Sequence, residues 1–346
     1  MAVQDLRIGV IGVGMMGADH AERVVNRIAG ARLVAVSDPD TARAHDLAAG
    51  FEGVRSIGDP LDLVADDDVD AVIVASPGFV HEEQVLACIE HGKYALCEKP
   101  LTMDSESSLR LVEAEAKAGQ PRVQVGFMRR FDPEYAQMKA MLDSGQFGRT
   151  LVLHNTHRNK TVPDSFRSEM IVRDSLVHEV DVARFIFGEE IAEITVLAGT
   201  PTSVAAEGVL DPQVSLFRMA GGGIVTSEVF VNCQVGYEVR CEAVAERGTI
   251  MAGSNSTGIY STVADEHGGY WGGQIAPDFR VRFARAYDLE VQAWVDASRR
   301  GEVVGPTSWD GYAATAVCTA GMESLATSLP VKVDLADRAA VLGGSS

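Results

Sequence analysis

The chain has 346 residues, 46% of them hydrophobic and 23% charged, which is the composition of a globular protein long enough for two domains. Its formal net charge of -19 argues against a nucleic-acid backbone or an anionic membrane surface as the main partner, because either would repel it. The first residues carry no export signal, no stretch resembles a membrane helix, and the five cysteines are scattered without metal-binding spacing. We therefore expect a cytoplasmic protein that binds a small molecule and no metal.

The first predicted element is a short buried strand that ends in glycines, LRIGVIGVG, from Leu6 to Gly14. It leads into the pattern Gly12-x-Gly14-x-x-Gly17, which a helix-like segment follows. In this pattern the first glycine permits a tight turn, the second lets a pyrophosphate approach the backbone, and the third lets the helix pack on the strand. We expect a dinucleotide to be bound by Gly12, Gly14, Met15, Met16 and Gly17.

A second strand, from Arg32 to Asp40, brings Asp38 to the position that contacts the adenine ribose in dinucleotide-binding folds. An acidic side chain there accepts hydrogen bonds from the ribose hydroxyls and repels the additional phosphate of NADP. Asp38 therefore favours NAD, with the reservation that Arg43 in the next helix could reach a phosphate. The alternative is that Asp38 only caps a turn before Pro39.

The alternation of strands and helices continues through the segments DAVIVASP, Asp70 to Pro77, and KYALCEKP, Lys93 to Pro100. This spacing predicts a doubly wound parallel sheet, a Rossmann fold, whose ligand lies beyond the carboxyl ends of the strands. Polar and turn residues at those ends are expected near the nicotinamide half of the cofactor, namely Ser76, Pro77, Glu98, Lys99 and Pro100.

After residue 126 the alternation stops, and successive strand-like runs broken by Gly, Asn and Pro predict an α+β domain. We therefore place a nucleotide-binding domain at residues 1–126 and a second domain at residues 127–346. Two late helices, over residues 279–301 and 313–327, are assigned to the second domain.

The segment RDSLVHEVDVARF, Arg173 to Phe185, is predicted to be a helix in which Asp174, His178 and Asp181 share one narrow stripe. The simplest interpretation is an amphipathic helix with this stripe in water. Phe185 falls inside the same stripe, where a solvated face would rarely place an aromatic ring. A cleft lined by these residues is the alternative.

Three motifs together resemble the Gfo/Idh/MocA family of sugar and polyol oxidoreductases: the glycine turn, the segment from Ala75 to Gln84, and Glu98-Lys99-Pro100. Further segments resemble the inositol-oxidising members of that family, and they run in order along nearly the whole chain: Gln124–Tyr135, Thr156–Asn159, Asp174–Asp181 and Gly305–Ala314. The resemblance implies an NAD(P)-binding domain followed by a domain with an open, largely antiparallel sheet, whose outer face mediates assembly into a homotetramer.

The same resemblance implies that Lys99, Asp174 and His178 converge on the substrate carbon that faces the nicotinamide. Oxidation of a secondary alcohol needs a base within reach of the hydroxyl, and a histidine suits that task near neutral pH. We expect His178 to take the proton, Asp174 to orient the imidazole or bind the same hydroxyl, and Lys99 to stabilise the developing alkoxide. Further contacts to the polyol are expected from Asp181, Arg129, His157 and Tyr237, and His81 is expected to shape the cofactor cleft.

These inferences predict NAD-dependent oxidation of myo-inositol to the 2-keto compound. Two alternatives stay open: oxidation of another polyol or sugar, such as scyllo-inositol, D-chiro-inositol or a pyranose, and a non-catalytic protein that senses the cofactor. Substrate choice depends on individual pocket contacts that motifs do not fix.

Overall fold

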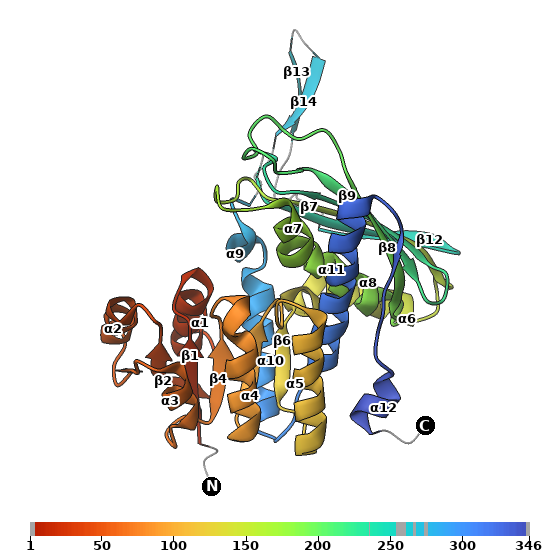
Figure 1. Cartoon of the computed structure of the whole chain (residues 1–346). Coiled ribbons are helices and arrows are strands. Elements are labelled where there is room, and N and C mark those ends of the chain that lie inside the picture. The colour runs from red at the N-terminus through yellow and green to blue at the C-terminus, as the bar shows by residue number, and fades with distance from the viewer. Residues whose placement is uncertain (1–3, 235, 254–260, 266–267, 273–275, 344–346) are drawn as a thin grey trace. The chain divides into compact units, whose positions relative to one another are not determined.

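The structure is a computed structural model that describes residues 4–234, 236–253, 261–265, 268–272 and 276–343 (Figure 1). The chain forms two compact units. Unit 1 contains Met1–Arg130, Arg285–Ala316 and Leu335–Ser346, and unit 2 contains Phe131–Ala284 and Val317–Asp334. This division differs from the predicted one, which had a single domain boundary after residue 126, because two C-terminal segments belong to unit 1.

Unit 1 is built on a six-stranded, wholly parallel sheet in the order β3-β2-β1-β4-β5-β6. This order confirms the predicted doubly wound fold, in which the strand order reverses beside β1. The central strands are buried apolar runs, as a sheet covered on both faces requires. The strands are β1 (Leu6–Ile11), β2 (Ala31–Ser37), β3 (Arg55–Ser56), β4 (Ala71–Val74), β5 (Tyr94–Glu98) and β6 (Val123–Gly126).

Aspartates begin several helices of unit 1. Asp40, Asp59 and Asp104 each accept a hydrogen bond from a backbone N–H of the first turn that follows. The helices and 3₁₀ turns are α1 (Met15–Asn26), α2 (Thr41–Ala49), α3 (Pro60–Ala65), η1 (Gly78–Val80), α4 (His81–Glu90), α5 (Ser105–Ala118), η2 (Met128–Phe131), α10 (Ala284–Ser298) and α12 (Arg338–Leu342), together with the first part of α11 (Ser308–Thr327), which continues into unit 2.

Helix α10 explains why a C-terminal segment belongs to unit 1. Its residues Val291, Trp294 and Val295 are buried in one core cluster with apolar side chains of β1, α1, β2 and α2. The predicted helix over residues 279–301 is therefore present, but most of it covers the nucleotide-binding sheet. Its apolar stripe alone could not show which sheet it covers.

Unit 2 is built on a seven-stranded sheet in the order β12-β11-β7-β10-β9-β8-β15. Strands β7 and β10 pair in parallel and the other pairs are antiparallel, which confirms the predicted, largely antiparallel α+β domain. The strands are β7 (Thr150–Arg158), β8 (Ile191–Ala198), β9 (Gln213–Met219), β10 (Ile224–Phe230), β11 (Glu238–Ala245), β12 (Gly248–Ala252) and β15 (Val331–Lys332), with a separate hairpin of β13 (Ser261–Asp265) and β14 (Gly268–Gly272). The helices are α6 (Pro133–Asp143), α7 (Ser168–Met170), the π-helical turn η3 (Ile171–Leu176), α8 (Val177–Phe187) and α9 (Phe279–Arg282).

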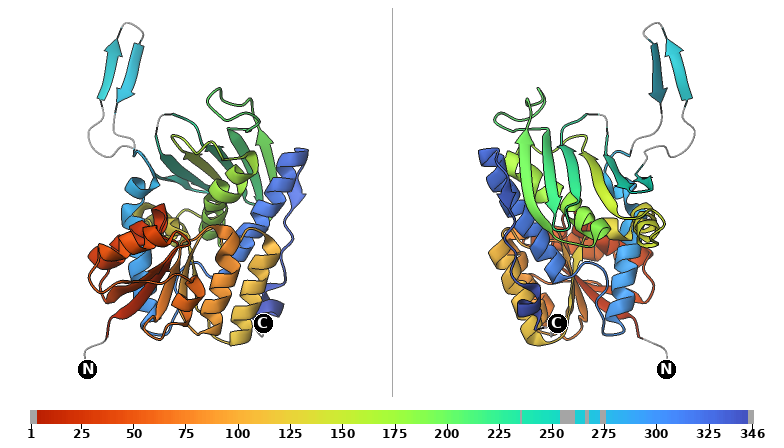
Figure 2. Two further views of the ribbon diagram at one scale, coloured as in Figure 1. Left: turned by 60° about the vertical axis from the view of Figure 1, so that its left-hand side comes forward. Right: turned by 90° about the vertical axis from the view of Figure 1, so that its right-hand side faces the viewer.

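One face of the unit 2 sheet is covered and the other is open. Burial alternates strictly along β9, as expected for a strand with one face in the core. Gly321 of α11 lies against Val172 and Ile194, where an added Cβ would meet these side chains at 2.9 and 3.0 Å. Among the described elements, no helix lies over the strands on the side turned to the viewer in the right-hand panel of Figure 2.

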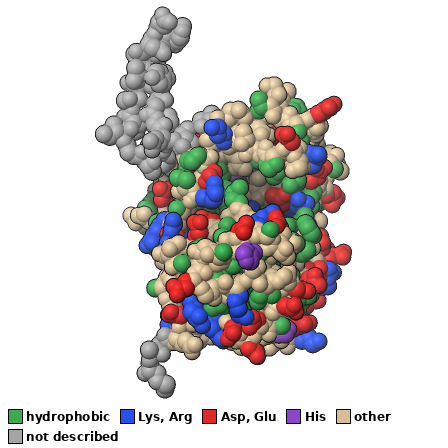
Figure 3. All heavy atoms as spheres, turned by 90° about the vertical axis from the view of Figure 1, so that its left-hand side faces the viewer, with side chains coloured by type: hydrophobic (Ala, Val, Ile, Leu, Met, Phe, Trp, Pro, Cys, Tyr) green, Lys and Arg blue, Asp and Glu red, His purple; other side chains and the backbone are tan. Residues whose placement is uncertain are grey.

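Within the described part of the chain, no helix is both long and apolar enough to cross a membrane. On the face shown in Figure 3, acidic and basic side chains are interspersed and form no continuous basic patch among the coloured atoms. This view provides no surface suited to a phosphate backbone.

Candidate active site

The glycine turn between β1 and α1 has the geometry that its sequence predicts. Gly12 has φ +81°, and a Cβ there would lie 2.5 Å from the backbone nitrogen of Ser76. A Cβ on Gly17 would lie 1.7 Å from the carbonyl oxygen of Gly12, so the helix packs on the turn with no room for a side chain. A Cβ on Gly14 would have no other described atom within 4 Å, which leaves space for a ligand to approach the backbone.

The first turn of α1 also has backbone donors to offer. Its N-cap is Gly14, which has no side chain to cap the turn, in contrast to the aspartate caps of α2, α3 and α5. Met15 is 61% exposed beside this turn and Met16 is half-buried. Open space and the N–H groups of the first turn together suit a pyrophosphate.

Asp38 lies at the end of β2 with its carboxylate held by two backbone N–H groups. Oδ2 accepts from Val13 at 2.8 Å and Oδ1 accepts from Asp40 at 2.9 Å. Oδ1 thus makes the turn contact across Pro39 that the alternative interpretation predicts, while Oδ2 reaches the glycine turn; the N-cap of α2 is Asp40. Arg43 lies 3.6 Å from Asp38 and 3.0 Å from Asp40, so its charge is already paired with two carboxylates.

His81 connects the ends of β4 and β5 from inside unit 1. Its Nε2 lies 2.8 Å from the carbonyl oxygen of Ser76, and its Nδ1 lies 3.0 Å from that of Pro100 and 3.4 Å from Cys97 Sγ. Burial, the largest influence, lowers the pKa of His81 although both carbonyl contacts favour the charged ring. His81 is 1% exposed, so it holds the two strand ends together from within unit 1. Its effect on cofactor binding stays a prediction.

The remaining predicted residues of unit 1 lie at the same edge of the sheet. Ser76 donates its hydroxyl to Gln84 at 2.6 Å, and Pro77 precedes the turn η1. Glu98 is buried at the end of β5, and Lys99, directly after it, is half-buried. Arg129 is 2% exposed on η2, just after β6.

In unit 2, the segment that carries Asp174 is not a regular α-helix. Residues Ile171–Leu176 form a π-helical turn, and α8 begins at Val177. The α-helical angle used to place Asp174 on the stripe of His178 therefore does not apply across this turn. Such turns are rare and concentrate at functional sites. Asp174 accepts two hydrogen bonds from Arg173, at 2.8 and 2.9 Å, a partner that no motif in the sequence indicated.

Helix α8 is buried almost all round, which overturns the interpretation of a polar stripe in water. His178 is 7%, Glu179 0% and Asp181 1% exposed. Buried charged side chains in a helix are costly unless they are paired or serve a site. Phe185 is half-buried, as its place within this stripe suggested.

His178, His157 and Tyr237 come together in unit 2. The ring centre of His157 lies 6.1 Å from the ring centre of His178 and 5.7 Å from that of Tyr237, and both pairs pack edge to face. His157 Nδ1 lies 3.0 Å from Glu179 Oε2, and both groups are buried. Glu179 could not be predicted from the sequence, because no characteristic residue spacing marks a glutamate that contacts a histidine on another element.

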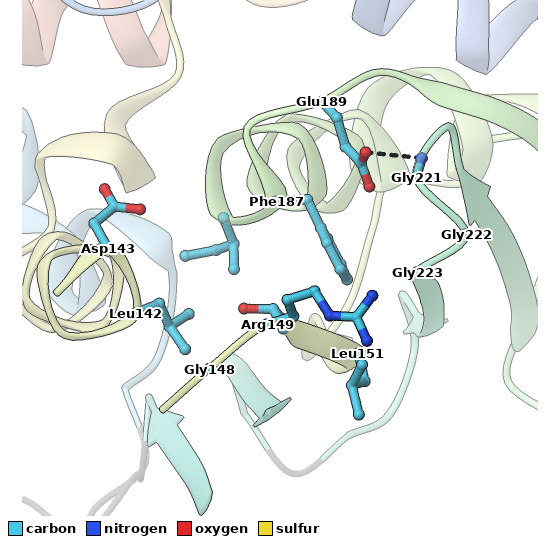
Figure 4. A pocket seen from close by; sticks show the side chains of 12 residues that line it. Leu142, Asp143, Gly148, Arg149, Leu151, Phe187, Glu189, Gly221, Gly222 and Gly223 are labelled. Atoms are coloured by element: carbon cyan, nitrogen blue, oxygen red, sulfur yellow. Dashed lines mark hydrogen bonds between the residues drawn. The ribbon is translucent and has the colours of Figure 1, made fainter. Parts of the chain in front are cut away.

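A cavity of about 500 Å³ lies elsewhere in unit 2, and none of the predicted site residues lines it (Figure 4). Its wall includes Phe187 at the end of α8, Arg149 before β7 and the glycine turn between β9 and β10. Side chains at two of these glycines would collide with Phe187 and Glu189, and Glu189 accepts the N–H of Gly221 at 2.8 Å. Packing therefore explains Gly221 and Gly223, and Gly222 has the positive φ of +92° that favours glycine. Among the described residues, no group of three or more His, Cys, Asp or Glu side chains could hold a metal ion.

The glycine turn, the carboxylate beside it and the parallel strand ends define unit 1 as a dinucleotide-binding domain of the Rossmann type. Residues 6–127 match the oxidoreductase family with an NAD-binding Rossmann fold, and residues 135–251 match the GFO/IDH/MocA C-terminal domain. The chain belongs to the Gfo/Idh/MocA family. Its first domain is an NAD-binding Rossmann domain, which confirms the predicted cofactor.

Curated relatives are similar over their whole length. The chain is 54% identical to inositol 2-dehydrogenase of Mycolicibacterium smegmatis, covering 99% of this chain and 100% of that one. It is 52% identical to inositol 2-dehydrogenase of Rhodococcus erythropolis, covering 98% and 99%.

Solved structures agree with this similarity. Myo-inositol dehydrogenase from Lactobacillus casei, in complex with NAD(H) and myo-inositol, matches with a TM-score of 0.91 and 32% identity over 98% of this chain and 100% of that chain. Scyllo-inositol dehydrogenase from the same organism, with bound NAD(H) and scyllo-inositol, matches with a TM-score of 0.86 and 26% identity over 95% and 99%.

Proposed function

We propose that this protein is an NAD-dependent dehydrogenase that oxidises a secondary hydroxyl of an inositol ring to a ketone, with myo-inositol converted to its 2-keto compound. The observation that carries the proposal is the 54% identity to an inositol 2-dehydrogenase over the full length of both chains. The residues expected to perform the reaction are all present, and the glycine turn has the open space that a dinucleotide needs.

His178 is the proposed general base. NAD, held at the glycine turn and Asp38, would supply the hydride acceptor for the carbinol carbon, and the hydroxyl proton would need a separate acceptor on the protein. The imidazole of His178 takes that proton, and the adjacent buried His157 and Glu179 hold the base in a polar cluster. Asp174, fixed by its two hydrogen bonds from Arg173, orients the base or the hydroxyl, and Lys99 stabilises the developing negative charge on oxygen.

The remaining hydroxyls of the ring need hydrogen-bonding partners of their own. We assign this task to Asp181, Arg129, His157 and Tyr237. Asp181 and His157 are 1% and 3% exposed, so their polar atoms are held in fixed positions, as discrimination between stereoisomers requires.

The activity is tested by initial rates of NAD reduction with myo-inositol, scyllo-inositol, D-chiro-inositol and glucose, repeated with NADP. A clear preference for myo-inositol with NAD is the expected result. Turnover of another polyol alone would keep the mechanism and replace the substrate. Binding of NADH without turnover of any polyol would contradict the proposal and favour a cofactor-sensing protein.

The role of His178 is tested by His178→Ala. We expect kcat to fall about 10²- to 10⁴-fold, the usual contribution of a general base, while NADH binding stays close to wild type. His45→Ala is the matched control, because the His45 side chain is 78% exposed on α2, outside both the proposed site and the proposed subunit interface. Wild-type kcat in His178→Ala would remove His178 from the mechanism.

We also propose that the protein is a cytoplasmic homotetramer in which the open face of the unit 2 sheet is an interface between subunits. Leu197 pairs with Val214 on this face, and Leu216 lies on the next row, which continues through Thr226, His154 and Glu242 to Met251. The four apolar side chains are 45 to 57% exposed. Apolar side chains gathered on one open sheet face are typical of an interaction surface.

A further inference from the structure

A chain of buried polar side chains runs through unit 1 from helix α1 to the end of strand β5. His20, on the second turn of α1, is 0% exposed, and its Nε2 lies 2.7 Å from Oε1 of Glu98. Its other ring nitrogen, Nδ1, lies 3.3 Å from Nη1 of Arg23. The imidazole thus joins a guanidinium on one side to a carboxylate on the other.

These two contacts fix the tautomer of His20. A guanidinium can only donate, so Nδ1 of His20 must accept from Arg23. The proton of a neutral ring is then on Nε2, which donates to Glu98. His20 therefore presents a fixed donor to the Glu98 carboxylate.

Arg23 is itself held in place from three sides. It donates to Asp19 at 2.8 Å and to Asp288 of α10 at 2.9 Å, and its guanidinium lies 5.2 Å from the ring centre of Tyr287. The same tyrosine ring packs edge to face on His20 at 5.9 Å. Arg23 and Tyr287 therefore limit the rotation of the His20 ring, independently of its contact with Glu98.

Glu98 is the last residue of β5 and directly precedes Lys99 in the chain. It is also packed against the end of β6, where a Cβ on Gly126 would lie 3.0 Å from Oε2. Burial, the largest influence, would raise the pKa of Glu98, but the interactions with His20, its hydrogen bond foremost, and the smaller ones with Lys99 together lower it. The Glu98 side chain is therefore held in its ionised form by His20, one residue before Lys99 in the chain.

We propose that His20 is a positioning residue that holds the Glu98 carboxylate in place, and that this carboxylate in turn keeps Lys99 as a fixed ammonium at the reaction centre. Lys99 then serves as a permanent positive charge for the developing alkoxide and not as the base, which leaves proton removal to His178. The assignment of Lys99 to catalysis rests on the proposed function, whereas the effect of His20 and Glu98 on the Lys99 ammonium does not.

Two amide variants of His20 separate this role from a structural one. His20→Gln carries an N–H₂ near the position of Nε2 and so keeps a donor for Glu98. His20→Asn is shorter, keeps an acceptor for Arg23 and loses the donor to Glu98. Glu98→Gln removes the carboxylate charge at almost the same shape.

The first readout is the rate at which an amine-reactive anhydride acylates Lys99 at pH 8.5, followed by mass spectrometry. Only the uncharged amine reacts, so a lysine that loses a fixed counter-charge is acylated faster. We expect acceleration by about fivefold or more in Glu98→Gln, about threefold in His20→Asn, and little change in His20→Gln. The exposed Lys117 and Lys332 serve as internal controls in the same samples.

The second readout is turnover with NAD and myo-inositol. We expect kcat to fall about 10- to 100-fold in His20→Asn, with KM for NAD changed less than about threefold, and His20→Gln to restore most of it. In a Glu98→Gln background, His20→Asn should have little further effect on kcat, because both changes remove the same interaction.

Equal acylation of Lys99 in wild type, His20→Asn and Glu98→Gln would overturn the proposal whether or not the enzyme turns over. If His20→Asn does not fold, Glu98→Gln still decides whether the carboxylate holds the ammonium. A wild type that binds NADH but oxidises no polyol would remove the proposed function, and the acylation rates would still decide the role of His20 and Glu98.

Discussion

At the scale of single residues, Asp38 combines a structural and a recognition role in one carboxylate. Each oxygen already accepts one backbone N–H, from Val13 and from Asp40, which fixes the direction of the remaining lone pairs. A carboxylate oriented in this way beside the glycine turn is suited to the two ribose hydroxyls of NAD. The neighbouring Arg43 is balanced by Asp38 and Asp40 and so presents little net positive charge.

This arrangement predicts that Asp38→Ser changes cofactor preference through Arg43. The substitution removes the repulsion of a 2′-phosphate and releases the Arg43 guanidinium from one of its two partners. We expect NAD affinity to fall about tenfold, roughly the loss of one charged hydrogen bond, and NADP affinity to rise. Isothermal titration of both cofactors measures the change.

The matched control is the double variant Asp38→Ser/Arg43→Ala. It should bind NAD as weakly as the single variant and lose the gain for NADP. An NAD-to-NADP ratio that is unchanged in Asp38→Ser would show that the ribose is bound by other residues.

At the scale of elements, the segment from β1 through the glycine turn to α1 contains one glycine required for packing and another suited to ligand binding. Gly17 has no space for a side chain, whereas Gly14 faces open space. Gly17→Ala should therefore cost about 3 kcal/mol or more, since the added methyl group must displace a backbone carbonyl. Gly14→Ala should cost about 1 kcal/mol at most as a poorer helix cap, yet weaken NADH binding at least about tenfold.

Thermal unfolding and NADH fluorescence titration together test this contrast. A Gly14→Ala variant with wild-type NADH affinity would show that the cofactor does not approach this part of the turn. A Gly17→Ala variant of wild-type stability would mean that α1 can move away from β1 without loss.

A pH-dependent contact joins β1 to β4. Arg7 donates to Asp70 from its backbone at 2.9 Å and from its guanidinium at 2.6 Å. Partial burial alone would raise the pKa of Asp70, but the hydrogen bonds from Arg7 outweigh it and lower the pKa. Because the folded-state pKa is depressed, the stabilisation is present above the ordinary carboxyl pKa of about 3.9 and is lost as the pH falls through the lowered value.

Asp70→Asn should therefore lower Tm at pH 7 by about 2–4 °C, the effect of about 1 kcal/mol in a domain of this size once solvent screening is allowed for. Differential scanning calorimetry at pH 7 and pH 3 should show the gap to wild type closing on the acid side. Asp68→Asn, at a 70% exposed carboxylate that also contacts Arg7, is the control expected to change little. A gap that is as wide at pH 3 as at pH 7 would contradict the assignment.

The same elements show how far the sequence predicts the structure. The nucleotide-binding sheet was predictable because its glycine turn and buried strands follow local rules of backbone conformation and burial. The π-helical turn at Ile171–Leu176 was not, because nothing in the local pattern separates it from the α-helix that follows. The contacts of Glu179 with His157 and of His20 with Glu98 join segments that are far apart in the sequence, so no local spacing of residues predicts them.

At the scale of the whole molecule, the two units do not follow one another along the chain, because unit 1 combines the N-terminal segment with two C-terminal segments. The apolar stripe of α10 was predictable, but its place on the nucleotide-binding sheet depends on the complementary core of β1, α1 and β2. The last of the two predicted helices is divided between the units: α11 contributes Ser308–Ala316 to unit 1 and its remaining residues to unit 2. A truncation after the first 126 residues would therefore leave the core of unit 1 without α10.

The open face of the unit 2 sheet gives the last prediction, which concerns assembly. Leu216 is 45% exposed in the centre of β9, so Leu216→Arg can point its charge into water in a single subunit and leave the fold intact. If this face joins subunits, a buried and unpartnered guanidinium would be costly there, and we expect the mass from light scattering to fall from that of a tetramer to a dimer or monomer. Leu329→Arg is the control, because Leu329 is 62% exposed and lies outside the sheet, and its mass should equal wild type. A monomeric wild type, or an unchanged mass in Leu216→Arg with a cooperative unfolding transition, would show that this face is not the interface.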